Sequence, residues 1–273
     1  MSDGLVLRTA AALFFLAMAP SLARAETLSV PLAYQGRDIE LVGDFTKPSG
    51  AGPFATVILL HGCGGNNSYG LGRSEEWAAL LHREGYATLI LDSFSARGFS
   101  NVCGNPGMVS AEERAKDIYA AAYVLAGRAD VRADKIAAMG FSHGGWAVLD
   151  AAAAARPQLG PFREQLATRG KIAAFVGFYP SCRRTETDDF VAPLLILVGD
   201  QDGLSNYRVC ERLAARPRPA GVEVRLKVYP GASHDFDYDH AHGTLRGTQL
   251  AYDEPAAADS RQEVATFLRR YLK

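Results

Sequence analysis

The chain has 273 residues, of which 48% are hydrophobic and 22% are charged, and 29 Lys and Arg against 30 Asp and Glu give a net charge of −1. Nucleic-acid binding is not expected because no basic excess is present to neutralise phosphates, and the apolar fraction is too high for a disordered chain. The length suits one large α/β domain or two small ones, so it leaves the domain count open.

The first predicted element is a leader. Arg8 precedes an uncharged apolar stretch over residues 9–22, and Ala23-Arg24-Ala25 supplies the small residues of a cleavage site. Pro20 interrupts the stretch, which is shorter than the roughly 20 apolar residues that span a bilayer. We predict a signal peptide over residues 1–25 and export to the periplasm or the medium. No membrane span is expected after cleavage.

Short, β-branched apolar runs alternate with amphipathic stretches along the rest of the chain. An alternating segment over residues 26–47 predicts an antiparallel hairpin at a sheet edge. The later strands are expected to be apolar on both faces, which is typical of parallel strands covered by helices on either side. These runs are residues 56–60, 87–91, 135–139, 172–176, 194–198 and 222–229.

Helices are predicted between the strands from their end signals. Ser74 is expected to cap a helix that Gly85 stops, and Ser110 opens a capping box. The alanine-rich stretch 142–155 and the C-terminal stretch 259–272 are further helices. This alternation predicts a doubly wound, mostly parallel α/β sheet flanked by helices, in a single domain over residues 26–273.

A G-x-S-x-G motif, Gly140-Phe141-Ser142-His143-Gly144, lies between the strand at 135–139 and the alanine-rich helix. A nucleophile elbow requires this strand, turn and helix setting. The glycines are needed because a Cβ in so tight a turn would clash with its neighbours. We therefore predict that Ser142 is a nucleophile, with an ordinary helix N-cap as the alternative reading.

A serine nucleophile needs a base and an acid that orients the base. His234 and Asp202 each come directly after a predicted strand, and the order Ser142, Asp202, His234 is that of α/β hydrolases. The carboxyl ends of the strands would bring the three side chains together. Other carboxylates remain open as the acid: Asp200, Asp188 and Asp189.

A glycine-rich turn, residues 61–65, follows the strand at 56–60. Such a turn can point backbone N–H groups at a reacting carbonyl. The backbone N–H groups of Cys63 and His143 are the predicted oxyanion hole. The side chains of His61 and His143 are expected to be structural, because this role uses only the main chain.

These features together resemble the dienelactone hydrolase family, in an exported form with serine at the elbow. The resemblance covers nearly the whole mature chain and implies an α/β-hydrolase sheet of about seven or eight strands with Ser142, Asp202 and His234 as a catalytic triad. Founding members carry cysteine at the elbow, so the family does not establish a dienelactone substrate. The matching segments are residues 61–65, 91–98, 140–145, 178–180, 199–202, 233–236 and 252–268.

The sequence therefore predicts a serine hydrolase that cleaves small carboxylic esters or lactones and requires no cofactor. An acyltransferase or peptidase on the same fold is one alternative, and a non-catalytic binding protein is another. The acidic run at 234–242 would suit a metal, but no metal is predicted because acyl transfer needs none. The oligomeric state stays open.

Two arginines on the predicted rim are candidate ligands for a substrate carboxylate. Arg97 lies in the loop after the strand at 87–91, and Arg183, next to Arg184, follows Pro180. Guanidinium groups bind carboxylates through paired hydrogen bonds.

The four cysteines suit an exported protein with two disulfides. Cys63 and Cys103 follow neighbouring strands at the same edge of the predicted sheet. Cys182 follows the strand at 172–176, and Cys210 lies in the helix after the next strand. We therefore predict the pairs Cys63–Cys103 and Cys182–Cys210.

Overall fold

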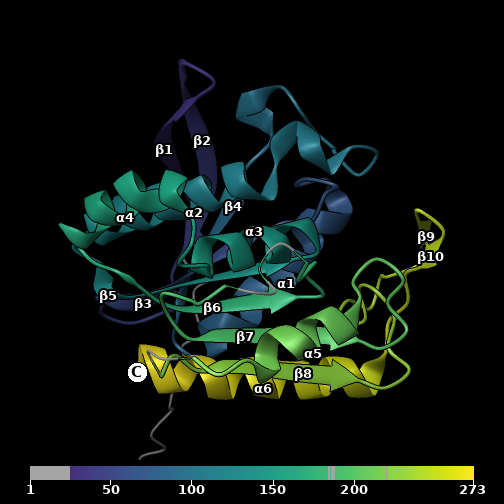
Figure 1. Cartoon of the computed structure of the whole chain (residues 1–273). Coiled ribbons are helices and arrows are strands. Elements are labelled where there is room, and N and C mark those ends of the chain that lie inside the picture. Colours follow the sequence, from purple (N-terminus) through teal and green to yellow (C-terminus); the bar gives the residue numbers. More distant parts are fainter. Residues whose placement is uncertain (1–24, 184, 186–187, 219–220) are drawn as a thin grey trace, which may run out of the picture.

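A computed structural model describes residues 25–183, 185, 188–218 and 221–273 and contains an eight-stranded sheet in the order β1-β2-β4-β3-β5-β6-β7-β8 (Figure 1). The β1–β2 and β2–β4 pairs are antiparallel and all other neighbours are parallel, as the sequence predicts. The strands are β1 (Glu26–Tyr34), β2 (Arg37–Thr46), β3 (Phe54–Leu60), β4 (Ala87–Asp92), β5 (Val131–Phe141), β6 (Ile172–Phe178), β7 (Leu194–Gly199) and β8 (Val224–Tyr229).

Helices cover both faces of this sheet. The helices α2 (Ala111–Ala126), α3 (His143–Ala152), α4 (Gly160–Ala167) and α5 (Tyr207–Ala215) pack on one face. The helices α1 (Ser68–Arg83) and α6 (Glu254–Leu272) pack on the other. A small hairpin, β9 (Thr244–Leu245) and β10 (Thr248–Gln249), stands apart from the sheet (Figure 1).

The central strands are apolar throughout because each of their faces meets a separate core. In β3, Ile58 and Leu60 belong to the core under α2 and α3, whereas Val57 and Leu59 belong to the core under α1 and α6. All four side chains are fully buried. This confirms the reading of continuous apolar runs as two-sided parallel strands.

The start of α1 differs from the predicted cap at Ser74. The helix begins at Ser68, and the Asn67 side chain caps it by accepting a hydrogen bond from the Gly70 N–H at 2.9 Å. Ser74 lies inside the helix and donates to the Gly70 carbonyl at 2.9 Å. The prediction was wrong because asparagine caps a helix as well as serine does. The cap at Ser110 is confirmed, since its hydroxyl accepts from the Glu113 N–H.

The C-terminal helix also begins earlier than predicted, at Glu254, where Asp253 caps it. Among the residues that the structure describes, no helix is both long and apolar enough to cross a bilayer. The predicted leader lies outside the described residues, except for Ala25.

Both predicted disulfides are present. Cys63 bonds to Cys103 and Cys182 bonds to Cys210, with Cα atoms 4.8 and 5.2 Å apart. The first bond joins the loop after β3 to the loop after β4, and the second joins the loop after β6 to α5.

Candidate active site

Ser142 occupies a sharp turn between β5 and α3. Its φ of 52° lies in the left-handed region, which is costly for a residue with a side chain. The turn packs so closely that a Cβ on Gly140 would lie 2.3 Å from the Gly144 carbonyl oxygen, and one on Gly144 would lie 2.4 Å from the Leu60 carbonyl oxygen. The G-x-S-x-G spacing therefore follows from the space that the turn leaves.

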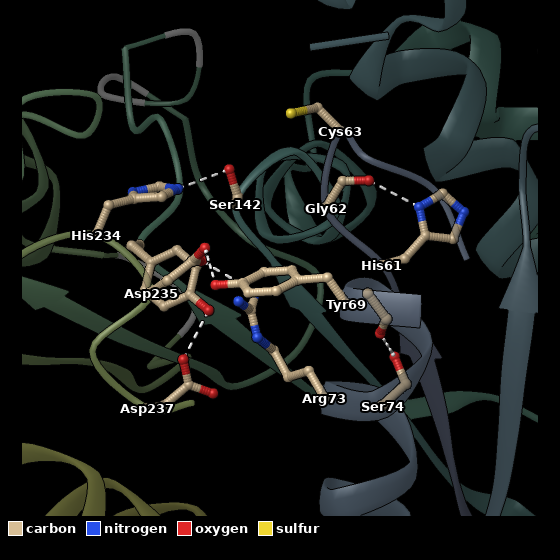
Figure 2. Close-up of polar contacts among 12 residues, drawn as sticks. His61, Gly62, Cys63, Tyr69, Arg73, Ser74, Ser142, His234, Asp235 and Asp237 are labelled. Atoms are coloured by element: carbon tan, nitrogen blue, oxygen red, sulfur yellow. Dashed lines mark hydrogen bonds and ion pairs between the residues drawn. The ribbon is translucent and has the colours of Figure 1, made fainter. Parts of the chain in front are cut away.

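His234 contacts both Ser142 and Asp202. Its Nε2 lies 2.9 Å from the Ser142 Oγ, and its Nδ1 lies 2.7 Å from the Asp202 Oδ2 (Figure 2 shows the contact with Ser142). Because a carboxylate only accepts hydrogen bonds, Nδ1 carries the proton and Nε2 is free to accept one from the serine hydroxyl. The structure thus brings the three predicted side chains together in the geometry of a nucleophile, base and acid.

The other carboxylates considered as the acid have different partners. Asp200 accepts from the Gly231 N–H at 2.8 Å, and Asp188 pairs with Arg156 at 2.9 Å. Asp189 is exposed. Asp202 is buried, and its second oxygen accepts from two backbone N–H groups of its own loop at 2.8 and 2.9 Å. Only Asp202 among these four carboxylates faces His234.

Two carboxylates near His234 in sequence anchor its loop to the rest of the site. Asp235 accepts from the Tyr69 hydroxyl at 2.8 Å and lies 3.0 Å from the Arg73 guanidinium (Figure 2). Burial raises the pKa of the Asp235 carboxyl, whereas the charges of Arg73 and then of His234 lower it. The lowering effects together exceed that of burial, so the pKa lies below its usual value. Sequence reasoning missed this anchor because its partners lie in α1, far away along the chain.

Asp237 is held in a similar way. It accepts from the Trp77 indole N–H at 2.9 Å and from the Tyr179 hydroxyl at 2.7 Å. The ring of Tyr179 also packs on the His234 imidazole, with centroids 4.5 Å apart. The acidic run that suggested a metal site therefore supplies buried hydrogen-bond acceptors for neighbouring side chains.

The Arg73 guanidinium that pairs with Asp235 belongs to a buried side chain, which is 4% exposed. Apart from Asp235, its guanidinium faces aromatic rings, whose centroids lie between 4.9 and 5.9 Å away. Such rings stabilise a desolvated cation through their negative faces. The rings belong to Tyr69, Phe141, Tyr179 and Tyr238.

The two predicted oxyanion donors lie beside Ser142. Cys63 and His143 both line a cavity that reaches Ser142 and His234. His143 is the first residue of α3, where the N–H has no acceptor within the helix. The Cys63 loop is fixed by its disulfide and by a hydrogen bond from the Val102 N–H to the Cys63 carbonyl at 2.8 Å. Both residues therefore line the cavity at Ser142, as the predicted oxyanion donors should.

Arg114 of α2 contacts the His143 side chain and both the carbonyl and the ring of His61. The Arg114 guanidinium lies 3.1 Å from the His143 Nδ1 and donates to the His61 carbonyl at 2.7 Å. Burial, followed by the charge of Arg114, lowers the pKa of His61 to about 3 and that of His143 to about 2. Both imidazoles are therefore neutral under ordinary conditions.

The prediction that Arg97 binds substrate was wrong. Arg97 is buried and donates to both oxygens of Asp117 at 2.9 and 2.7 Å and to the Ser93 carbonyl at 2.6 Å. Its guanidinium also covers the Tyr34 ring at 4.6 Å. Sequence placed this arginine at the correct edge of the sheet but could not show that Asp117 in α2 would neutralise it.

Arg183 is exposed and lines neither cavity at Ser142, so the structure does not bring it to the site. Its neighbour Arg184 lies outside the described residues. An arginine that the sequence did not single out, Arg246 in the β9–β10 turn, lines the smaller cavity instead.

Two cavities of about 120 and 190 Å³ both reach Ser142 and His234. They also share the Cys63–Cys103 disulfide and Leu245 of β9. The smaller one extends along Trp146 and Tyr179, and the larger one extends along the glycine-rich loop to Tyr69. Together they leave room for a small molecule on both sides of the serine.

The chain is similar to proteins of one known family. The model of the dienelactone hydrolase family matches residues 43–272. A curated relative from Bradyrhizobium, described as a probable 2-oxo-3-(5-oxofuran-2-ylidene)propanoate lactonase, is 26% identical over 245 residues, which cover 83% of this chain and 88% of that protein.

Solved structures show the same fold. A putative dienelactone hydrolase from Klebsiella pneumoniae aligns with a TM-score of 0.64 at 20% identity, over 91% of this chain and 100% of that one. Thermogutta terrifontis esterase 2 phosphorylated by paraoxon aligns with a TM-score of 0.65 at 17% identity, over 93% of this chain and 96% of that one.

Proposed function

The chain belongs to the dienelactone hydrolase family and is a carboxylic ester hydrolase, and we propose that it cleaves esters or lactones through an acyl-enzyme on Ser142. The observation that carries this mechanism is the hydrogen-bonded chain Ser142–His234–Asp202, with contacts of 2.9 and 2.7 Å. The proposed oxyanion donors are the backbone N–H groups of Cys63 and His143, two residues that line the cavity at Ser142.

In the proposed reaction, the Ser142 Oγ attacks the carbonyl carbon while its proton moves to the His234 Nε2. Asp202 stabilises the resulting imidazolium, and the two backbone N–H groups bind the tetrahedral oxyanion. His234 then protonates the leaving alcohol oxygen as the C–O bond breaks. Water repeats the sequence on the acyl-enzyme, which releases the acid and restores Ser142.

Small lactones are the first substrates to test. The Bradyrhizobium relative is described as a lactonase, and the cavities of about 120 and 190 Å³ suit a small molecule. In a lactone, the alcohol and acyl parts stay joined after the ring opens, so one compact cavity system holds both.

We also propose that residues 1–25 are a cleaved leader and that residues 26–273 act as a single exported domain. The two disulfides support an oxidising compartment such as the periplasm or the medium.

The mechanism is tested by labelling with a fluorophosphonate. Wild-type protein should bind the probe covalently and hydrolyse p-nitrophenyl acetate and a five-membered lactone. Ser142→Ala should lose labelling and at least about 10³-fold in kcat. Ser68→Ala, at an exposed serine, is the control and should match wild type. Labelling that persists in Ser142→Ala would overturn the proposal.

A further inference from the structure

A buried arginine lies behind the proposed oxyanion hole. Arg114, in α2, has no exposed surface. No carboxylate forms an ion pair with it in the described ranges. Asp117, one turn further along α2, is already bound to Arg97 at 2.7 Å, and Glu113, the preceding residue, pairs with Lys116 at 2.6 Å. A fully buried cation without a direct counter-ion is costly, so its position calls for a function.

Arg114 instead contacts the two residues that frame the oxyanion hole. One of its terminal nitrogens donates to the His61 carbonyl at 2.7 Å, and the other lies 3.1 Å from the His143 Nδ1. The guanidinium also lies over the Phe94 ring, 4.9 Å from its centroid. His61 opens the loop that carries Cys63, and His143 is itself a proposed donor.

Arg114 determines the position of the proton on the His143 imidazole, and the backbone of Ser93 and Gly62 determines it on the His61 imidazole. A guanidinium only donates hydrogen bonds, so the His143 Nδ1 accepts and its proton is on Nε2. The His61 Nε2 accepts from the Ser93 N–H at 3.2 Å, so its proton is on Nδ1, which donates to the Gly62 carbonyl at 2.7 Å. The His61 ring thus fixes Gly62, the residue before Cys63.

Arg114 is the charged member of the group that it forms with His61 and His143. Of the carboxylates nearby, Asp117 is neutralised by Arg97, and Asp92 lies 4.0 Å from the His61 Nε2. Both imidazoles are neutral, as described above, and burial lowers the pKa of Arg114 to about 9, which leaves it charged at neutral pH. The charge lies against the His61 carbonyl and the His143 ring, on the two segments that would bind the negative oxygen of a tetrahedral intermediate. In a low-dielectric interior such a charge acts strongly and needs no reorganisation during the reaction.

We infer that Arg114 is a positioning residue of the oxyanion hole, which orients the Cys63 and His143 backbone donors and supplies positive potential to the oxyanion. This inference rests on the proposed function, because it requires an oxyanion at Ser142. Arg114 acts through His61 and His143 and needs no contact with the substrate.

The test compares Arg114→Gln with Arg114→Lys. The glutamine variant should lower kcat by about 10- to 100-fold with KM within about threefold of wild type, because the lost interaction exists only in the transition state. Inhibition by phenylboronic acid, which forms a tetrahedral adduct with serine, should weaken by the same factor. The lysine variant keeps the charge and should recover part of the loss.

Arg163→Gln is the matched control. Arg163 holds the opposite end of α3 by donating to the Ala151 and Ala153 carbonyls at 3.1 and 2.6 Å. Its loss should reduce stability and leave kcat and boronate inhibition close to wild type. A folded Arg114→Gln variant with kcat within threefold of wild type would overturn the inference.

A measurement on the wild-type protein covers the case in which the variants do not fold. Long-range ¹H–¹⁵N spectra should show the proton of His61 on Nδ1 and that of His143 on Nε2, with neither ring titrating between about pH 5 and 8. A His143 proton on Nδ1, or titration of either ring in that range, would contradict the role of Arg114. If Ser142→Ala still labels, the proposed function fails. If only the Arg114 results fail, the proposed function stands.

Discussion

The two sides of Ser142 differ in the buried charged groups that surround them. On the side of the base, Asp202 contacts His234 directly, and the next residue, Asp235, pairs with Arg73. Asp237 accepts from Tyr179, whose ring packs on the imidazole. On the side of the oxyanion hole, Arg114 is charged and the two histidines are neutral. We name the two sides the anionic half and the cationic half after the charged groups that contact the two sets of residues; Asp92, 4.0 Å from the His61 Nε2, is a carboxylate beside the cationic half.

This division matches the charges that the proposed reaction creates. The tetrahedral intermediate pairs an imidazolium on His234 with an oxyanion near Cys63 and His143. Each half of the site carries the charge that stabilises the species formed next to it. Buried charges act more strongly than surface charges, so a chain with a net charge of −1 needs no large surface field for this chemistry.

The two halves are also held by different kinds of interaction. Side chains of α1 and of the loop after β6 bind Asp235 and Asp237 on the anionic half. On the cationic half, a disulfide and a backbone hydrogen bond hold the Cys63 loop, and Arg114 holds its base. Substitutions in the two halves should therefore have different effects.

The largest effect is expected from neutralising the acid. Asp202→Asn should lower kcat by about 10⁴-fold, because an amide cannot hold the imidazole in the required tautomer or stabilise its charged form. Steady-state kinetics with p-nitrophenyl acetate measure this loss. Asp200→Asn is the control, since Asp200 contacts the Gly231 N–H and not His234. Equal losses in the two variants would contradict the assignment of the acid.

The two disulfides should contribute similarly to stability but differently to catalysis. They close loops with sequence separations of 40 and 28 residues, so replacing both cysteines of either pair by serine should cost about 4 kcal/mol of unfolding free energy. Only loss of Cys63–Cys103 should also lower kcat, by about 10-fold, because it frees an oxyanion donor. Denaturant titrations and kinetics of the two double variants test this. An equal loss of kcat in both would argue against it.

The two halves should respond to acid at different pH values. The pKa values of His61 and His143 are lowered from 6.5 to about 3 and about 2, so below pH 6.5 the unfolded chain binds protons that the folded chain does not. The stability that depends on the neutral rings is present above pH 6.5 and is lost as the pH falls. Between pH 7 and 5 this should cost about 2 kcal/mol per histidine.

Asp235 in the anionic half behaves differently. Because its pKa is lowered from 3.8, it contributes to the free energy of unfolding until the pH falls below that value. Urea unfolding at about pH 7 and 5 measures the difference between the halves. His143→Gln should reduce the loss of unfolding free energy by about 2 kcal/mol. His240→Gln, at a side chain that is 72% exposed, should leave it unchanged. No change in His143→Gln would show that His143 titrates normally.

The smallest effect is expected from Tyr69→Phe. This change removes one hydrogen bond to Asp235 and keeps the ring beside Arg73. It should cost about 1–2 kcal/mol of unfolding free energy, as is usual for a bond to a charged group. We expect kcat to change less than threefold, because Arg73 still holds Asp235. A thermal or urea midpoint equal to that of wild type would show that Tyr69 does not anchor the loop.

The sequence by itself determined the features that depend on local order. Strand ends, the glycines around Ser142 and the sequence order of Ser142, Asp202 and His234 are properties of short segments or of their succession along the chain. Parallel strands end at one edge, so the sequence also predicted which groups would meet there, including both disulfides. Local geometry fixes these features before distant packing is known.

Only the tertiary structure decided which buried charges would be paired. Tyr69 and Asp235 are 166 residues apart, and Arg114 meets residues 29 and 53 positions away. Nothing in the local sequence distinguishes Arg97, which Asp117 neutralises, from Arg114, which has no such partner. The energy of a buried charge depends on the groups that the whole fold places around it, so the two charged halves of the site emerged only with the complete fold.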